Sequence, residues 1–316
     1  MTCYETDTLG VGGSIWVSGF GMVISTVLCA KLVFAHYKNL NYPSAQKLLF
    51  VVLTAPVLLG WPSWTVLVAG EKAVFLELLA DMAKAVLSYF FTLYAICLLG
   101  KELNGDSYKF NPANLETSLL GLGSVKHLLK CFGEIKLDSS EAVASFLKRV
   151  KICVVQYLVV LVLVFVGGVV YIIADGSSSV GDLEESGYAG ITAVKLLSTL
   201  VALYHFFTFS GALKQVPHLD QLNIATKFTS IKLCFMATQF QPLVLWVFAA
   251  LGLIADTQVC SASETTVFAS NLLMCSEMLA LAFVQVFLYP PLEYKPNTER
   301  SPQPVKDTLN IETTKL

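Results

Sequence analysis

The stretch "VKICVVQYLVVLVLVFVGGVVYIIA" (residues 150–174) carries a single charged side chain, Lys151, close to its start. A helix rises ~1.5 Å per residue, so about 20 apolar residues are enough to cross ~30 Å of hydrocarbon. The stretch is therefore predicted to be a membrane-spanning helix. The whole chain has the same character, because 55% of its residues are hydrophobic, only 14% are charged and the mean hydropathy is +0.66. We predict a polytopic membrane protein.

The same test succeeds in six further windows, so the predicted fold class is all-α, a bundle of seven transmembrane helices. The predicted spans are residues 13–36, 46–69, 73–99, 150–174, 188–213, 228–253 and 266–289. They make up a transmembrane domain over residues 13–289. Residues 1–12 are predicted to be an extracellular amino terminus, 100–149 a cytoplasmic loop and 290–316 a disordered cytoplasmic tail.

Lysine and arginine residues between the spans predict the orientation, since cytoplasmic loops retain positive charge. Nearly all of them lie in the loops at 37–46, 100–149 and 214–227 and in the tail after 290, whereas the opposite side has only Lys72. The amino terminus is therefore predicted to lie outside and the carboxyl terminus inside, with the plasma membrane as the expected location. The net charge of −2 gives no indication of nucleic-acid binding, and membrane lipids are the expected surroundings.

The stretch "FLELLADMAKAVLSYFF" (residues 75–91) places charged residues inside the third predicted span. On a helix, Glu77, Asp81, Lys84 and Ser88 fall at i, i+4, i+7 and i+11 and form one polar stripe. A charge at the centre of a bilayer costs about 2.5–3.5 kcal/mol, so such groups pair with one another or line a pathway. The stripe is predicted to face protein or water rather than lipid.

Depth along the spans suggests partners for the stripe. At ~1.5 Å per residue, Lys84 and Glu277 both lie near the midplane, whereas Asp81 and Lys195 lie roughly 7 Å further out. The predicted pairs are therefore Lys84 with Glu277 and Asp81 with Lys195.

Two interpretations of these charges remain open: ties between helices, or a partly wet cavity that binds a ligand. In the second, the anionic group of a ligand meets Lys84 or Lys195 and its apolar body lies on aromatic and methionine side chains. Pro242 removes a helical hydrogen bond nearby, which fits either interpretation. The predicted substrate pathway consists of Glu77, Asp81, Lys84, Ser88, Lys195, Phe206, Gln239, Gln241, Pro242, Trp246, Glu277 and Met278.

Several stretches resemble one family of membrane proteins over most of the chain. They are "TAPVLLGWPSW" (54–64), "SYFFTLYAICLLGKELNG" (88–105), "GYAGITAVKLLSTLVALYHFF" (187–207), "ATKFTSIKLCFMATQFQPLVL" (225–245) and "NLLMCSEMLAL" (271–281). The chain resembles the organic solute transporter subunit alpha family, which also takes in the transmembrane protein 184 group. The most specific positions are Lys227, Phe228, Gln241, Pro242 and Glu277.

The resemblance implies facilitated transport, not driven by ATP, of steroid-like amphipathic solutes such as bile acids and steroid conjugates. It also implies an alpha subunit that forms a heteromer with a small single-pass beta subunit. The family typically has a run of cysteines after the third span, whereas this chain has only Cys131 in that region.

Other classes of function find less support in the sequence. The third span ends in "CLLGKE" without the Asp-Arg-Tyr of rhodopsin-like receptors, although a seven-helix receptor or a trafficking or scaffold protein remains the alternative. No Ser or Cys stands at helical spacing from a His and a carboxylate, so we expect no enzyme activity. The cysteine and histidine spacings predict no metal site, and no cofactor is expected.

Three further sites are predicted at or beyond the membrane surfaces. Cys3 and Cys260 both lie on the predicted outer side, where a disulfide can form. Cys131 ends a weakly amphipathic segment, 114–132, that either lies on the inner leaflet or forms an ordinary loop helix, and it is a candidate for acylation. The terminal "TKL", with Thr314 and Leu316, fits the groove of a PDZ-domain protein.

Overall fold

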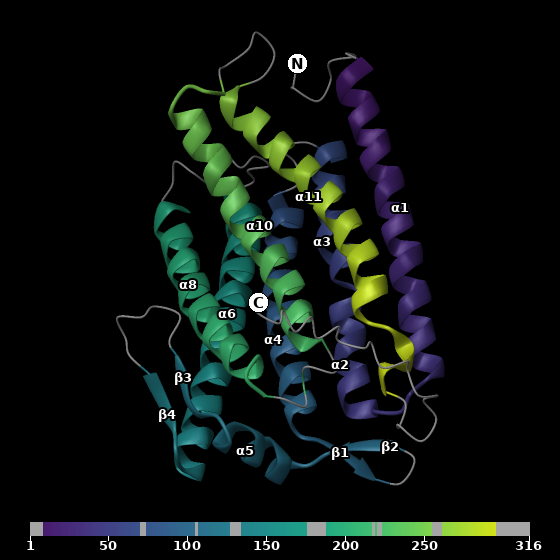
Figure 1. Cartoon of the computed structure of the whole chain (residues 1–316). Helices are drawn as coiled ribbons and strands as arrows, with labels where there is room; N and C mark the ends of the chain where they lie inside the picture. Colours follow the sequence, from purple (N-terminus) through teal and green to yellow (C-terminus); the bar gives the residue numbers. More distant parts are fainter. Residues whose placement is uncertain are drawn as a thin grey trace, which may run out of the picture.

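The computed structural model describes residues 9–69, 74–104, 107–126, 134–175, 188–216, 219, 223–254 and 261–294. Long helices dominate it (Figure 1). They are α1 (Leu9–Lys38), α2 (Pro43–Leu53), α3 (Ala55–Ala69), α4 (Val74–Leu99), α6 (Ser140–Asp175), α8 (Tyr188–Leu213), α10 (Ile224–Ala250) and α11 (Ala262–Leu288).

Six segments of the described chain are helical, long and apolar enough to cross a membrane, which supports an integral membrane protein. They are Gly12–Lys38, Pro43–Ala69, Leu79–Leu99, Ser140–Val170, Ala193–Leu213 and Glu264–Leu288. The remaining predicted span lies in α10, a helix of 27 residues whose described apolar part is Phe240–Ala250. The count of seven spans and the orientation of the termini stay predictions.

The second span is interrupted at Thr54, between α2 and α3. The amide of Thr54 donates to the carbonyls of Phe50 and Val51, both at 3.2 Å, and this closes α2. Pro56 follows and has no N–H with which to continue the ladder of α2. The break therefore stands just before a proline, which cannot donate the next hydrogen bond of the α2 ladder.

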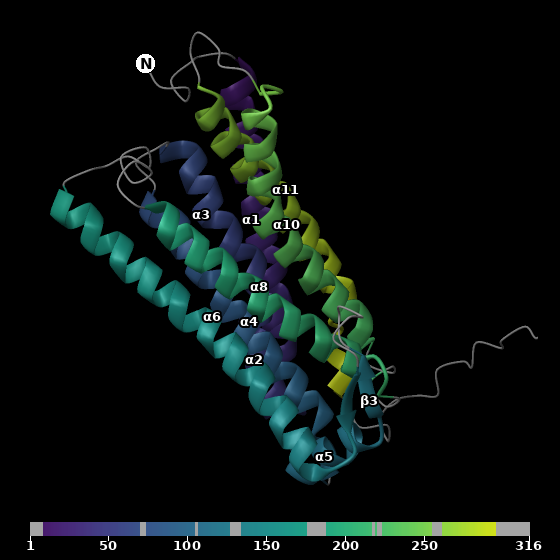
Figure 2. The same cartoon turned by 90° about the vertical axis from the view of Figure 1, so that its left-hand side faces the viewer.

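The helices pack in two groups joined by α4. On one side α1, α3 and α11 contact one another and α10 lies against α11, and on the other side α6 packs on α4 and α8. Figure 2 shows α6 at one edge of the bundle and α10 and α11 at the other. A cluster of buried rings connects α4, α8 and α10, with the ring of Phe228 centred 4.5 Å from that of Phe91 and 5.2 Å from that of Phe206. Phe206 is thus a core residue.

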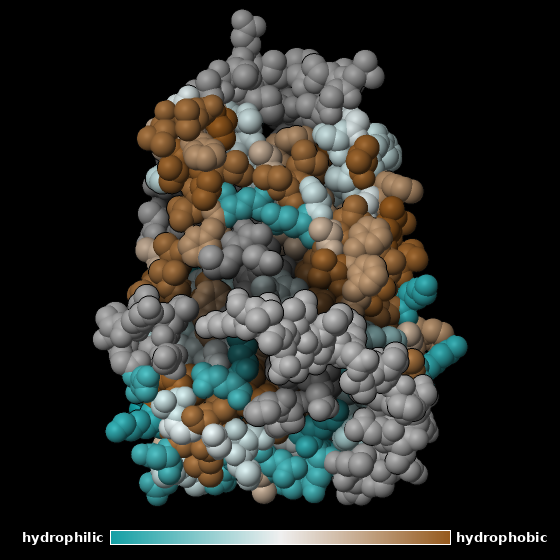
Figure 3. Space-filling view, in the orientation of Figure 1, coloured by the Kyte–Doolittle hydropathy of each residue, from teal (hydrophilic) through white to brown (hydrophobic). Residues whose placement is uncertain are grey.

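The outer surface of the bundle is apolar. Large hydrophobic side chains are exposed on several helices, including Trp16 at 77%, Leu163 at 65% and Phe287 at 79%. Figure 3 shows hydrophilic residues gathered at the end of the molecule that carries the hairpins, below a mainly hydrophobic surface. Patches of this extent are rare on soluble monomers and indicate contact with lipid.

The loop after α4 adds two short β-hairpins to a fold in which helices dominate, as the all-α prediction expects. Strand β1 (Lys101–Asn104) pairs antiparallel with β2 (Ser107–Phe110), and β3 (Gly123–Lys126) pairs with β4 (Glu134–Leu137). The short helix α5 (Pro112–Leu120) lies between the two hairpins.

The segment 114–132 is therefore not one amphipathic helix. Helix α5 ends at Leu120, and Gly123 takes a φ of +64°, which favours glycine and turns the chain into β3. Leu119 and Val125 are fully buried in the protein core. Their apolar side chains pack against the bundle, so they are not available to the inner leaflet.

The beginning of the tail is ordered, contrary to the prediction of disorder from residue 290. Pro291–Tyr294 form a 3₁₀ helix, η3, in which Glu293 and Tyr294 are buried. Local composition suggested disorder, whereas contacts with distant helices hold these residues.

Gly60 lies where α1, α3 and α11 meet, and Gly60→Val is expected to destabilise the protein. A Cβ at Gly60 would overlap the fully buried end of the Met22 side chain and would stand 3.2 Å from Met278 Cβ, which is fixed to the backbone of α11. Overpacking of this kind costs about 1–3 kcal/mol, so the thermal unfolding midpoint in detergent should fall. Gly167→Val is the matched control, because nothing lies within 4 Å of a Cβ there. Equal midpoints for the two variants would contradict the close packing.

Candidate functional site

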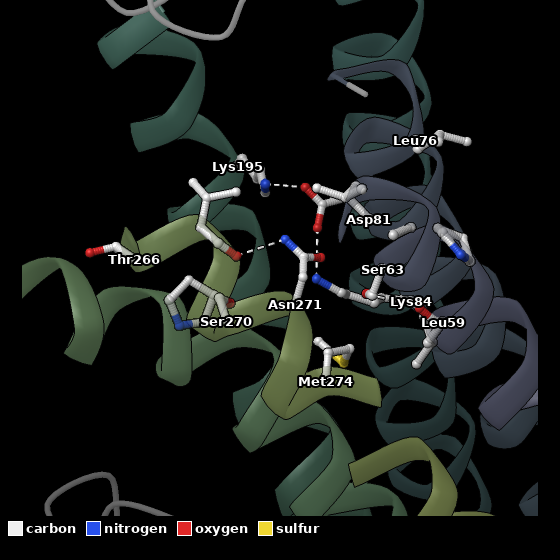
Figure 4. A pocket seen from close by; sticks show the side chains of 15 residues that line it. Leu59, Ser63, Leu76, Asp81, Lys84, Lys195, Thr266, Ser270, Asn271 and Met274 are labelled. Carbon is white, nitrogen blue, oxygen red and sulfur yellow. Dashed lines mark hydrogen bonds and ion pairs between the residues drawn. The ribbon is translucent and has the colours of Figure 1, made fainter. Parts of the chain in front are cut away.

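A cavity of about 240 Å³ lies among five helices of the bundle. Figure 4 shows the charged side chains that line it, with Asp81 between Lys84 and Lys195. The lining comprises Leu59, Pro62, Ser63 and Val66 of α3, Leu76, Ala80, Asp81 and Lys84 of α4, Lys195 of α8, Pro242 of α10 and Thr266, Val267, Ser270, Asn271 and Met274 of α11.

Asp81 accepts from two lysines in this cavity. Lys84 Nζ donates to Asp81 Oδ1 at 2.8 Å, and Lys195 Nζ forms an ion pair with Asp81 Oδ2. The side chains of Asp81, Lys84 and Lys195 are only 14%, 9% and 24% exposed. We call these three residues the charged triad. It joins α4 to α8 within the membrane region.

One of the two predicted pairs is confirmed and the other is wrong. Asp81 pairs with Lys195, as depth along the spans predicted. Lys84 bonds to Asp81 three positions earlier, because i,i+3 neighbours face each other on a helix. Glu277 is half-buried on α11, and its Oε2 is buried with no hydrogen-bond partner in the structure described. Glu277 and the fully buried Met278 are not among the lining residues of the cavity.

Two prolines stand on the cavity wall. Pro62 of α3 and Pro242 of α10 each lack an N–H, so each leaves the carbonyl four residues earlier without its usual intrahelical donor. At membrane depth such backbone is tolerated only where protein, water or a ligand satisfies it. The cavity is therefore bordered by two helices that are locally weakened.

Ser88 lies one turn beyond Lys84 and lines a separate small void. Its hydroxyl donates to the Lys84 carbonyl at 2.9 Å. The void, about 10 Å³, is also bordered by Tyr157, Thr199 and Phe206 and is close to the size of one water molecule. The polar stripe of α4 thus continues past the main cavity.

The other predicted pathway residues are scattered. Gln241 Nε2 donates to the Ser270 carbonyl at 3.3 Å, which ties α10 to α11 next to the cavity. Trp246 is 61% exposed on the outer surface, so it does not form a wall for a ligand in this cavity.

Glu77 and Gln239 lie in α4 and α10, but their side chains fall outside the described part. Cys3, Cys131, Cys260, Thr314 and Leu316 also lie outside the described residues, and their sites stay predictions.

The sequence did not predict a second buried ion pair at the hairpin end. Lys227 Nζ of α10 contacts both carboxylate oxygens of Glu293 in η3. Lys227 is 0% exposed and Glu293 is 8% exposed. The family resemblance had singled out Lys227 only as a position typical of the family, without indicating a partner for it. An isolated acidic residue in the apolar stretch "YPPLEY" (289–294) was the one signal in the sequence for its partner.

Aromatic side chains surround this pair. Tyr94 Oη of α4 lies 2.6 Å from Tyr294 Oη, and the rings of His36 and Tyr294 are 5.8 Å apart. Burial, with a smaller contribution from the Glu293 carboxylate, raises the pKa of the Tyr294 phenol well above its usual range. Tyr294 therefore stays protonated and able to donate.

In the described ranges, no three His, Cys, Asp or Glu side chains gather in a way that could hold a metal ion.

Comparison with known proteins shows that most of the chain matches one protein family. The family model described as organic solute transporter Ostalpha matches residues 14–295. Protein LAZ1 homolog 1 of Arabidopsis thaliana is 26% identical over 286 residues, which cover 87% of this chain and 56% of that protein. The chain thus spans a little over half the length of this curated relative. No solved structure matches the chain.

Proposed function

Because the chain belongs to the organic solute transporter Ostalpha family, we propose that it is a facilitative transporter of amphipathic organic solutes. The proposed solutes are anionic and steroid-like, such as bile acids and steroid conjugates, and the proposed location is the plasma membrane. The cavity that contains the charged triad is the proposed binding site. The observation that carries this proposal is a buried, shared carboxylate between two ammonium groups inside a membrane protein of a transporter family.

Exchange of ion-pair partners gives the site a way to bind an anion. Asp81 holds Lys84 and Lys195 together, and the carboxylate or sulfate of a solute can replace one of these contacts without leaving a buried ammonium unpaired. Lys195 suits this exchange, since it is the most exposed member of the triad and belongs to a different helix. Buried ion pairs gain little over apolar replacements in stability, so a triad retained in the bilayer fits a binding role.

The size of the cavity limits what it encloses. Ligand sites usually measure about 300–1,000 Å³. At about 240 Å³ this cavity accommodates the charged end of a solute and only part of an apolar body. The remainder must lie against lipid or in space that opens when α3 and α10 bend at Pro62 and Pro242. We propose that this bending accompanies transport.

Uptake of a radiolabelled steroid sulfate into proteoliposomes tests the proposal. The assay is run with the chain alone and with a single-pass beta subunit, because the family resemblance implies such a partner. Uptake above that of empty liposomes under either condition is expected. Absence of uptake under both, with the protein folded, would favour the alternative of a receptor or scaffold.

Lys195→Gln is expected to reduce uptake roughly tenfold or more. Loss of a hydrogen bond to a charged group costs about 1.5–3 kcal/mol, and each 1.4 kcal/mol is about a factor of ten in affinity. Asp81 keeps its ion pair with Lys84 in this variant, so the variant should still fold. Lys148→Gln is the control, because Lys148 is exposed near the start of α6, far along the chain from the cavity lining. Similar losses in both variants would argue against anion binding at Lys195.

A further inference from the structure

The chain turns back into the bundle after α11 instead of leaving it. Tyr289 ends the helix, and its carbonyl lies 3.0 Å from His36 Nε2 of α1. Four residues later Glu293 reaches Lys227 of α10, and Tyr294 reaches Tyr94 of α4. The short segment 289–294 therefore contacts three separate helices at the hairpin end. Figure 1 shows α11 ending at the same end of the molecule as the hairpins.

The contacts of this segment are buried but polar. Tyr94, Lys227, Tyr289 and Tyr294 are all 0% exposed. They are joined by an ion pair and a hydroxyl–hydroxyl hydrogen bond, and the Lys227 ammonium also lies 5.1 Å from the centre of the Tyr289 ring. Water can replace the polar part of these contacts when the segment leaves its site, whereas the rings of Tyr289 and Tyr294 also lose their burial in the hydrophobic core. Release of the segment therefore means breaking a small set of defined contacts.

The segment and the cavity share α4 and α10. At ~1.5 Å per residue, Tyr94 lies about 20 Å from Asp81 along α4, and Lys227 lies about 22 Å from Pro242 along α10. The buried rings of Phe91, Phe206 and Phe228 fill the space between these helices on the hairpin side. Along α4 and α10, this aromatic layer lies between the level of the cavity and the level of the segment.

We propose that residues 289–294 form a gate that closes the hairpin end of the pathway and must release Lys227 and Tyr94 before a solute can pass. This proposal rests on the proposed function and adds a control point to it. In the closed state, Glu293 holds α10 and Tyr294 holds α4. When the segment swings out, both helices lose this connection and their hairpin ends can separate. A static anchor would make the same contacts but would never need to break them.

A reversible crosslink distinguishes a gate from an anchor. In a background without native cysteines, Tyr94→Cys and Tyr294→Cys are combined and joined by a bifunctional thiol reagent cleavable by reduction. Uptake should fall at least tenfold on crosslinking and return after reduction. Each single-cysteine variant should show the same uptake before and after treatment with the reagent. Unchanged uptake in fully crosslinked protein would overturn the gate.

A second measurement does not depend on transport. Ser63→Cys places a thiol on the cavity wall, and a membrane-impermeant thiol reagent is added on the hairpin side. Glu293→Gln weakens the closure but keeps an oxygen that can accept from Lys227, so labelling should become about tenfold faster. The Tyr94–Tyr294 crosslink should slow it. If neither change alters the labelling rate, the gate is wrong, whereas absent uptake by the unmodified protein would overturn only the proposed function.

Discussion

Asp81→Ala is expected to cause the largest loss of any single substitution in this protein. It removes the carboxylate that both Lys84 and Lys195 contact and leaves two ammonium groups inside the membrane region. Breaking a buried pair by removing one partner costs about 3–5 kcal/mol, and here one carboxylate serves two partners. The yield of folded protein and its thermal midpoint in detergent should both fall sharply, with uptake lost as well.

A triple variant separates folding from transport. Asp81→Ala combined with Lys84→Met and Lys195→Met removes all three charges and fills most of the space with apolar atoms. Replacement of a complete buried ionic group in this way is often neutral or stabilising, so folding should recover. Uptake should stay absent, because no ammonium remains for the solute. Normal uptake by the triple variant would assign the triad to helix association alone.

Lys227→Glu is expected to have the second largest effect. It places a carboxylate against that of Glu293 in a site where the natural lysine is 0% exposed. The loss of the buried pair alone costs about 3–5 kcal/mol, and like charges add to it. The thermal midpoint should fall, and the bonds of the carboxyl-terminal segment should become accessible to limited proteolysis.

The exchange Lys227→Glu with Glu293→Lys is the decisive control. It restores opposite charges at the same two positions and should recover part of the lost midpoint. A coupling energy under ~0.5 kcal/mol in the mutant cycle would mean that the two residues do not depend on each other. Exposed Lys136→Glu, in strand β4 opposite Ser124, shows how much a charge reversal costs outside the bundle.

Length and composition alone identified most of the membrane helices. The predicted span at 13–36 corresponds to Gly12–Lys38, and that at 46–69 corresponds to Pro43–Ala69, with α2 and α3 joined at Thr54. A bilayer makes this possible, because every backbone group in it must be paired within the helix and the span must match a fixed thickness. The start of α6 at Ser140, ten residues before the predicted span, lies outside that constraint.

The pairing of charges could be predicted only in part. Sequence position gives the depth of a residue in the membrane, and this was enough for Asp81 and Lys195. It does not give the rotation of each helix about its axis, which packing decides. Lys84 therefore turned out to bond within its own helix, and Glu277 lies elsewhere on α11.

The sequence by itself indicated the membrane surroundings of this protein, the segments long and apolar enough to span a bilayer and the polar stripe of α4, because each depends on local composition and helical spacing. Only the tertiary structure decided which helices border the cavity, and that residues from α3, α4, α8, α10 and α11 meet there. It also decided that Glu293 returns to Lys227 across 66 positions of sequence. Such contacts follow from how whole helices pack, and no pattern within a single segment contains that information.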